Sequence, residues 1–220
     1  MRPFFFFLLI LSTFSIQAQR HKYDSNRIGV QGQYVLLDLN SSNFETNQEA
    51  GFLVGLSKRS AFYNNFDLIF GVDFMQTSVS MNARGEASTV EKVEYTWSGA
   101  QVKLLLSYLI AGDHLSLEVG PILQVNGKME LDDVNQSDLV LQNYTSLTAE
   151  DVQEWSRVNG LVSVGLSAGF THVRLTANYQ YGFTNALNKL NDEGLELKDP
   201  AATNFEGNLG LITAGIVLYL

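Results

Sequence analysis

The sequence predicts an all-β fold, an eight-stranded antiparallel up-and-down transmembrane β-barrel with short periplasmic turns and long extracellular loops. Three observations lead to this prediction. Apolar and polar residues alternate with a period of two in eight segments, and the connections between these segments alternate between long and short. Beyond the N-terminal segment, no apolar run approaches the roughly 20 residues that a membrane-spanning helix needs.

The N-terminal segment has the layout of a secretory signal peptide. Arg2 supplies a positive charge, residues 4–11 form an apolar run, and Ala18 is the small residue before the expected cleavage site. The run is too short to cross a membrane as a helix. We therefore expect an exported protein in which the signal peptide, residues 1–18, is removed and residues 19–220 form one outer-membrane β-barrel domain.

The clearest alternation runs through residues 173–184, where one face is apolar and the other is polar or small. Successive side chains of a strand point to opposite faces, so this segment predicts a strand with one face in an apolar environment. Seven further segments show versions of the same pattern: 27–36, 51–59, 66–74, 101–110, 115–126, 162–170 and 207–220.

The connections alternate strictly between two classes along the chain. Three are short, at residues 60–65, 111–114 and 171–172. Four are long and rich in charged and polar residues, at 40–48, 80–94, 129–157 and 185–205. Bacterial outer-membrane barrels have short periplasmic turns and longer extracellular loops. An even strand number then places both termini on the periplasmic side.

Alternation alone also fits a soluble lipocalin-like binding barrel or a soluble β-sandwich, and both stay as alternatives. The polar faces are rich in Gly, Ser, Gln and Asn, which suits the narrow interior of an eight-stranded barrel. The apolar faces continue over five or six positions, and aromatic residues lie near both of their ends, as in the girdles of membrane barrels. These aromatic residues are Phe66, Tyr108 and Phe170 near the short turns, and Phe74, Tyr181 and Phe183 toward the long loops.

With these strands, the Ala18-Gln19 junction and the terminal Val217-Leu218-Tyr219-Leu220, the chain resembles the PorT-like outer-membrane β-barrel family, which is related in architecture to OmpA-like and OmpX-like barrels. Members of that family usually end on Phe, whereas this chain ends on Leu220. The resemblance implies location in the cell outer membrane and insertion by the barrel-assembly machinery. It also implies a structural, adhesion or secretion-accessory role.

The polar strand faces place seven charged residues inside the predicted barrel, and we expect a filled polar lumen. An unpaired buried charge costs several kcal/mol, so we expect Asp73 to approach Lys103 and Glu118 to pair with Arg174. A structural filling is favoured over a gate or a narrow pore for ions or small solutes, because eight strands leave little room for a pathway. The seven residues are Arg27, Arg59, Asp67, Asp73, Lys103, Glu118 and Arg174.

Composition argues against several other functions. The chain has no cysteine, and its histidines, His21, His114 and His172, all lie outside the long loops, so no imidazole is expected at the outer rim. We therefore expect neither an enzyme, a cofactor nor a metal site, and we expect a monomer. The net charge of −9 argues against nucleic acid as a partner.

The long loop at 129–157 is the candidate interaction site. It carries seven acidic residues against Arg157 alone, with apolar residues among them. We expect part of it, near 139–141, to continue the strands as a protruding hairpin. Loops on a rigid scaffold commonly carry function, so we expect a protein or surface polymer to bind here, above the lipid and lipopolysaccharide of the outer membrane. The candidate contact residues are Asp132, Asp133, Tyr144 and Trp155.

Overall fold

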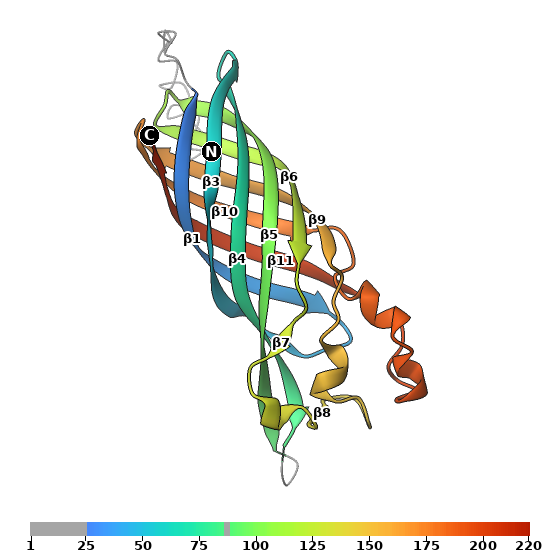
Figure 1. Cartoon of the computed structure of the whole chain (residues 1–220). Helices are drawn as coiled ribbons and strands as arrows, with labels where there is room; N and C mark the ends of the chain where they lie inside the picture. Colours follow the sequence, from blue (N-terminus) through green and yellow to red (C-terminus); the bar gives the residue numbers. More distant parts are fainter. Residues whose placement is uncertain (1–25, 86–88) are drawn as a thin grey trace, which may run out of the picture.

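The structure is a computed structural model that describes residues 26–85 and 89–220, and the expected signal peptide, its cleavage site and His21 lie outside the described residues. Its main feature is a β-barrel of eight long strands (Figure 1). In the described part of the chain, no helix is both long enough and apolar enough to span a membrane.

The ring contains strands that follow one another in chain order. They are β1 (Arg27–Ser41), β3 (Glu49–Tyr63), β4 (Phe66–Arg84), β5 (Val90–Ala111), β6 (Leu115–Asn126), β9 (Val158–Gly169), β10 (Val173–Gly182) and β11 (Gly207–Tyr219). The long connections hold short elements: β2 (Thr46–Asn47), β7 (Glu130–Leu131) and β8 (Val140–Leu141), and the 3₁₀ helices η2 (Val134–Gln136), η3 (Ala149–Val152), η4 (Asn188–Asp192) and η5 (Leu195–Leu197).

Every ring strand pairs antiparallel with its two neighbours, and β1 pairs with β11 from Gly29↔Tyr219 to Ser41↔Gly207, which closes the barrel. The turns after β3, β5 and β9 are tight, and Asn64 and Gly112 adopt the left-handed backbone conformation that such turns use. The predicted fold class, strand number and up-and-down order are therefore confirmed. The C-terminus lies at the short-turn end (Figure 1).

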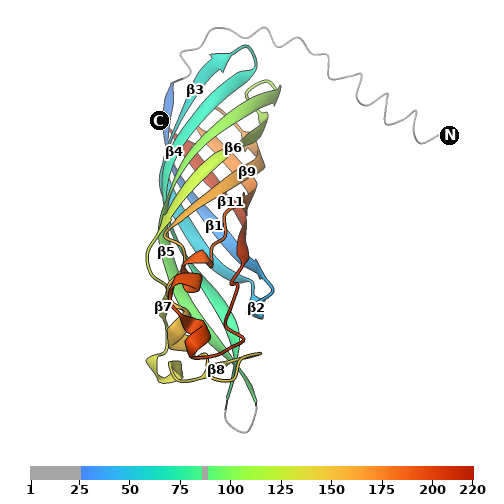
Figure 2. The same cartoon turned by 90° about the vertical axis from the view of Figure 1, so that its right-hand side faces the viewer.

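One predicted loop is wrong. Residues 80–94 were expected to form a long connection, but β4 continues to Arg84 and β5 begins at Val90. The two strands stay paired over this length, from Ser80↔Glu94 to Arg84↔Val90. They form a hairpin that extends well beyond the rest of the ring (Figure 2). The hairpin persists because one of its faces is apolar and is covered by other loops.

The outer face of the barrel carries an apolar band with a sharp edge. On β4 the outward residues are apolar from Phe66 to Phe74 and polar from Gln76 onward, and on β5 the change falls between Ala100 and Ser98. Phe74 and Ala100 are partners in the β4–β5 register, so the edge lies at one height on both strands. Nine residues of β4 match the strand length of about 9–11 residues that crosses a bilayer.

Aromatic side chains lie at both margins of this band. Phe66 and Tyr108, near the short turns, have ring centroids 5.1 Å apart. Phe52 and Phe74, at the opposite margin, have centroids 6.4 Å apart. Two such margins are the expected position of interfacial girdles.

Two glycines near the β1–β11 seam provide a matched test of how tightly the barrel is packed. A Cβ at Gly215 would lie 2.1 Å from the Gly32 carbonyl oxygen and 2.5 Å from Gln33 Cα, whereas a Cβ at Gly32 would meet nothing within 4 Å. We expect Gly215→Ala to lower the free energy of unfolding by about 1–3 kcal/mol, because backbone atoms must move. Gly32→Ala is the control and should be neutral in urea titrations; equal losses would contradict the register.

Candidate functional site

The long connections fold together on the protruding β4–β5 hairpin. The β6–β9 connection, residues 127–157, packs against the apolar face of this hairpin, and the β10–β11 connection, residues 183–206, packs on the β6–β9 connection and joins the same hydrophobic cluster. We call these two connections and the hairpin beyond the apolar band the cap. Figure 2 shows the cap at the end of the barrel opposite the short turns.

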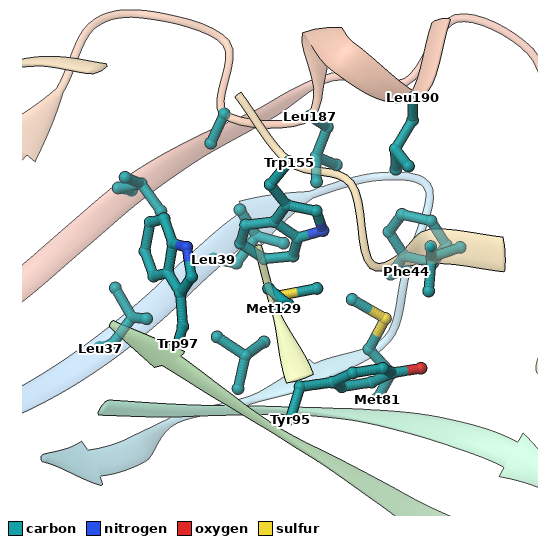
Figure 3. Packing of buried hydrophobic residues seen from close by; sticks show 14 of the residues in the cluster. Leu37, Leu39, Phe44, Met81, Tyr95, Trp97, Met129, Trp155, Leu187 and Leu190 are labelled. Carbon is teal, nitrogen blue, oxygen red and sulfur yellow. The ribbon is translucent and has the colours of Figure 1, made fainter. Parts of the chain in front are cut away.

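The cap has a hydrophobic core of its own. Trp155, from the β6–β9 connection, packs edge-on against Trp97 of β5, with ring centroids 5.4 Å apart. Leu187 and Leu190 of the β10–β11 connection lie on one side of this pair, and Met129 lies beneath it (Figure 3). Two connections distant in sequence and the β4–β5 hairpin therefore share one core.

The same core continues down into the barrel. Inward-facing residues of the upper strands belong to the cluster that contains the two tryptophans. The expected polar lumen therefore describes the half nearer the short turns. In the other half apolar side chains predominate and form what we call the apolar plug, beside the buried polar side chains of Asn126 and Asn159. The inward residues of the plug include Val35, Leu53, Met75, Ile122, Leu161 and Leu211.

Backbone pairing fixes the β6–β9 connection to the hairpin. β8 pairs with β4 at Ala83↔Leu141 and Arg84↔Val140, and β7 pairs with β5 at Tyr95↔Leu131. The buried Tyr95 hydroxyl donates a 2.9 Å hydrogen bond to the Ala149 carbonyl, and burial raises the pKa of Tyr95. The expectation that the segment near 139–141 forms a protruding hairpin is therefore wrong: the hairpin is β4–β5, and β8 pairs with β4 beside it.

Asp199 links the two connections of the cap. Its buried carboxylate accepts backbone N–H bonds from Thr145 (2.6 Å), Ser146 (2.8 Å) and Ala201 (2.9 Å). These bonds, led by that from Ser146, lower the pKa of Asp199 to about 2. Because Thr145 and Ser146 belong to the β6–β9 connection, the carboxylate joins one connection to the other.

A second link lies beside the first. Lys198 Nζ is 2.5 Å from Asp151 Oδ2, and the Ser146 hydroxyl donates to the Lys198 carbonyl at 2.6 Å. Partial burial raises the pKa of Asp151, but hydrogen bonds from Lys198 and Thr148 outweigh this effect and the net pKa is lowered. The two connections are therefore held by charged contacts as well as by the shared core.

The four candidate contact residues divide into two groups. Asp132 and Asp133 are exposed, and Asp133 accepts a 3.0 Å bond from the Asn135 N–H at the start of η2. Tyr144 and Trp155 are buried in the cap core, so the expectation that they contact a partner is corrected. The aromatic rings are needed to fill the space between the connections. Val134 and Leu197, which sequence reasoning did not select, are 76% and 91% exposed.

The lower lumen contains a buried ion network centred on Arg59. Arg59 Nη1 lies 3.2 Å from Asp67 Oδ2 and donates to the Ser107 hydroxyl at 2.9 Å, and its other terminal nitrogen pairs with Glu118. Asp67, Ser107 and Glu118 are register partners on three adjacent strands, β4, β5 and β6. One guanidinium from β3 therefore satisfies a polar row across the lumen.

The expected approach of Asp73 and Lys103 is present, with Lys103 Nζ 2.9 Å from Asp73 Oδ2. Lys103 is the register partner of Gly71, and a Cβ at Gly71 would lie 2.5 Å from Lys103 Cε. The lysine stem crosses β4 through the space that this glycine leaves. Gln31 donates to the other oxygen of Asp73.

The expected pairing of Glu118 with Arg174 is wrong. Glu118 pairs with Arg59, whereas Arg174 donates to the Ser167 hydroxyl at 2.7 Å and the Ser116 hydroxyl at 3.1 Å, and also to the Asp113 carbonyl. The prediction placed the pair across one intervening strand, β9, but the barrel is narrow enough for Arg59 of β3 to reach Glu118 of β6 across the lumen. Arg27 lies at the rim and donates to the Thr171 carbonyl at 3.0 Å.

The lumen leaves little open space between these layers. A cavity of about 20 Å³, which has room for about one water molecule, lies beside Lys103, Glu118 and Ser57. Above it, Gln101 donates to Gln124 at 2.8 Å and to Gln180 at 3.1 Å. The apolar plug follows directly. The arrangement fits a filled lumen.

Comparison with known proteins identifies the fold. No family model and no curated protein matches the sequence. Among solved structures, Neisserial surface protein A is similar, with a TM-score of 0.51, 16% identity and coverage of 87% of this chain and 96% of that chain. This chain has the fold of a small outer-membrane β-barrel. At this identity the similarity shows the fold alone.

Two further solved structures are similar at lower scores. Ail, the attachment invasion locus protein of Yersinia pestis, has a TM-score of 0.47 at 13% identity, with 89% of this chain and 99% of that chain covered. The outer membrane protein OprG from Pseudomonas aeruginosa has a TM-score of 0.48 at 10% identity, with 90% and 97% covered.

Sequence reasoning missed the elements that hold the cap together. Trp97 and Met81 continue the inward alternation of β5 and β4 beyond the apolar band, and this continued period of two was the available signal. Asp199 gave no such signal, because its N–H donors Thr145 and Ser146 lie more than 50 residues away in the chain.

The Asp73–Lys103 pair is tested by breaking it and then removing both charges. We expect Lys103→Met to lower the free energy of unfolding by about 3–5 kcal/mol, because it leaves a buried carboxylate unpaired. The double variant Lys103→Met, Asp73→Asn should recover most of this loss in urea titrations followed by tryptophan fluorescence. A single variant no less stable than the double variant would contradict the pairing.

Asp199 predicts acid sensitivity of the cap. Its pKa is lowered from about 3.9 in an unfolded chain to about 2, so its stabilising contribution is complete above about pH 4 and is lost as pH falls through about pH 2. Near-ultraviolet circular dichroism of Trp97 and Trp155 should report this loss. Asp199→Asn should loosen the cap already at pH 6 and remove its acid transition.

The exposed neighbour Asp192 supplies the control for this experiment. Asp192→Asn should leave both the spectrum at pH 6 and the acid transition unchanged. If Asp199→Asn also kept the acid transition, the carboxylate would not be the group responsible.

Proposed function

We propose that this protein is an outer-membrane barrel that presents the cap outside the cell as a rigid interaction surface. The observation that carries the proposal is the single core shared by the cap connections and the upper lumen. Loops that are ordered before binding lose less conformational entropy when a partner arrives. A cap of this kind suits recognition better than loosely attached loops would.

The placement in a membrane rests on the outer face of the barrel. The exposed apolar band, with aromatic residues at both margins, has the height and pattern of a lipid-facing surface. The short turns would face the periplasm and the cap would face the exterior, above lipopolysaccharide. Export through a cleaved signal peptide at residues 1–18 and insertion by the barrel-assembly machinery belong to the same proposal.

The exposed surface of the cap supports binding to a macromolecular partner. Leu197 and Val134 project from 3₁₀ helices, and the acidic Asp132 and Asp133 directly precede Val134. Loops held on a rigid scaffold commonly carry function, and these exposed side chains are the contact points that we propose. The partner would be a protein or a surface polymer, and a PorT-like secretion-accessory role is one form of this interaction.

A pore and an enzyme are less well supported. The ion layers, the glutamine layer and the apolar plug occupy the lumen in succession, which favours a filled barrel over a solute pathway. His114 and His172 lie in the short turns, far from the cap. We therefore propose a role without catalysis, and steady channels in planar bilayers would contradict the filled lumen.

Membrane insertion is tested by one substitution made at two heights. Val164 lies midway along the apolar band on β9, and Val90 lies at the end of the hairpin, where it is 64% exposed. We expect Val164→Arg to lower the free energy of folding into lipid vesicles by about 2–4 kcal/mol. Val90→Arg should have no such effect, and equal stability of the two variants would contradict the lipid-facing band.

The interaction role is tested by photo-cross-linking on intact cells. A cross-linking amino acid at Leu197 or Val134 should give a defined adduct of higher mass, because both side chains project from the cap. The same amino acid at Ile212, within the apolar band, is the control and should not give that adduct. Absence of an adduct from both cap positions would contradict a macromolecular partner.

A further inference from the structure

The β10–β11 connection contains a pocket that the interaction role above does not use. Its volume is about 360 Å³, within the range of about 300–1,000 Å³ typical of small-molecule sites. One wall is formed by η4 and η5, and the other by the segment from Ala202 to Glu206. The pocket therefore lies within a single connection of the cap.

The walls of the pocket are held by part-buried hydrogen bonds. The Asn191 side chain accepts from the Phe205 N–H at 2.8 Å and donates to the Phe205 carbonyl at 3.1 Å, and Asn185 donates to the same carbonyl at 2.8 Å. The Phe205 ring is buried and stacks on Phe44 with centroids 5.6 Å apart. Such a pocket is already formed before a ligand arrives.

The Glu206 backbone is held on both sides. Its N–H donates to the Asn43 side chain at 3.0 Å, and its carbonyl accepts from the Ser41 hydroxyl at 2.7 Å. Glu206 lines the pocket and is exposed. The backbone clamp therefore fixes the point from which this side chain extends.

Two carboxylates line the pocket, those of Glu196 and Glu206. Among the described residues, no lysine or arginine forms an ion pair with Glu196 or Glu206, since Lys189 pairs with Glu193 and Lys198 pairs with Asp151. The side chains of Asn188 and Asn204 and the Thr203 hydroxyl add neutral donors and acceptors. This lining favours a cation with hydroxyl groups and disfavours phosphate or sulfate.

We propose that this pocket binds a small hydroxylated organic amine, of which an amino sugar is the simplest example. The two carboxylates would receive the ammonium group, and the amides and the threonine would bond the hydroxyls. The proposal goes beyond the interaction role proposed for the cap by naming a small-molecule ligand class and a site.

The test is calorimetric titration of the full refolded chain in detergent micelles with glucosamine hydrochloride. We expect saturable binding at one site. The double variant Glu196→Gln, Glu206→Gln should weaken it by about tenfold or more, because charge-assisted hydrogen bonds are lost. The control Glu130→Gln, Glu150→Gln removes two exposed cap carboxylates outside the pocket and should leave binding unchanged.

N-acetylglucosamine supplies a neutral probe of similar shape and should bind about tenfold more weakly or worse than glucosamine. No saturable binding of glucosamine, equal binding of the two sugars, or equal binding to both double variants would overturn the proposal. Heat-modifiable gel mobility shows that each variant is folded. Glucosamine binding without any cap cross-link would remove the macromolecular partner and leave the pocket, whereas cross-linking without glucosamine binding would do the reverse.

Discussion

The narrowness of an eight-stranded ring is the constraint on which the rest of the structure depends. Such a ring encloses only enough space for side chains. Every inward charge must therefore find a partner across or along the wall, and Arg59 does so by reaching Asp67 and Glu118 from β3. Where the charges end, the lumen is completed by apolar residues, and this change from polar to apolar determines what the loops above can do.

The apolar plug leaves an unfinished hydrophobic surface at the top of the barrel, and the loops complete it. Trp155 packs on Trp97, whose strand continues out of the ring, and Leu187 from a separate connection lies beside Trp155. Asp199 then ties those connections together by accepting N–H bonds that a folded loop would otherwise leave unpaired. Barrel and cap are thus one packed unit, and function moves to the cap surface and its pocket.

The sequence could predict the structural features that follow from the alternation of apolar and polar residues along each strand. The outward apolar face, the eight strands and the local approach of Asp73 to Lys103 all follow from alternation and neighbouring register. Contacts across the lumen could not be predicted this way, which is why Arg174 was paired with the wrong carboxylate. The loops have no period, so Trp155 looked like a contact residue of an acidic loop when it is the centre of a core.

Hydrogen–deuterium exchange of the full chain, folded in lipid vesicles, tests the shared core most directly. The account predicts that amides of the cap with internal partners, such as those of Leu141, Ala149 and Ser156, are protected nearly as long as those of the barrel strands. Exchange of these amides within seconds, while the strands of the ring stay protected, would show that the loops are not folded onto the barrel and would contradict the account.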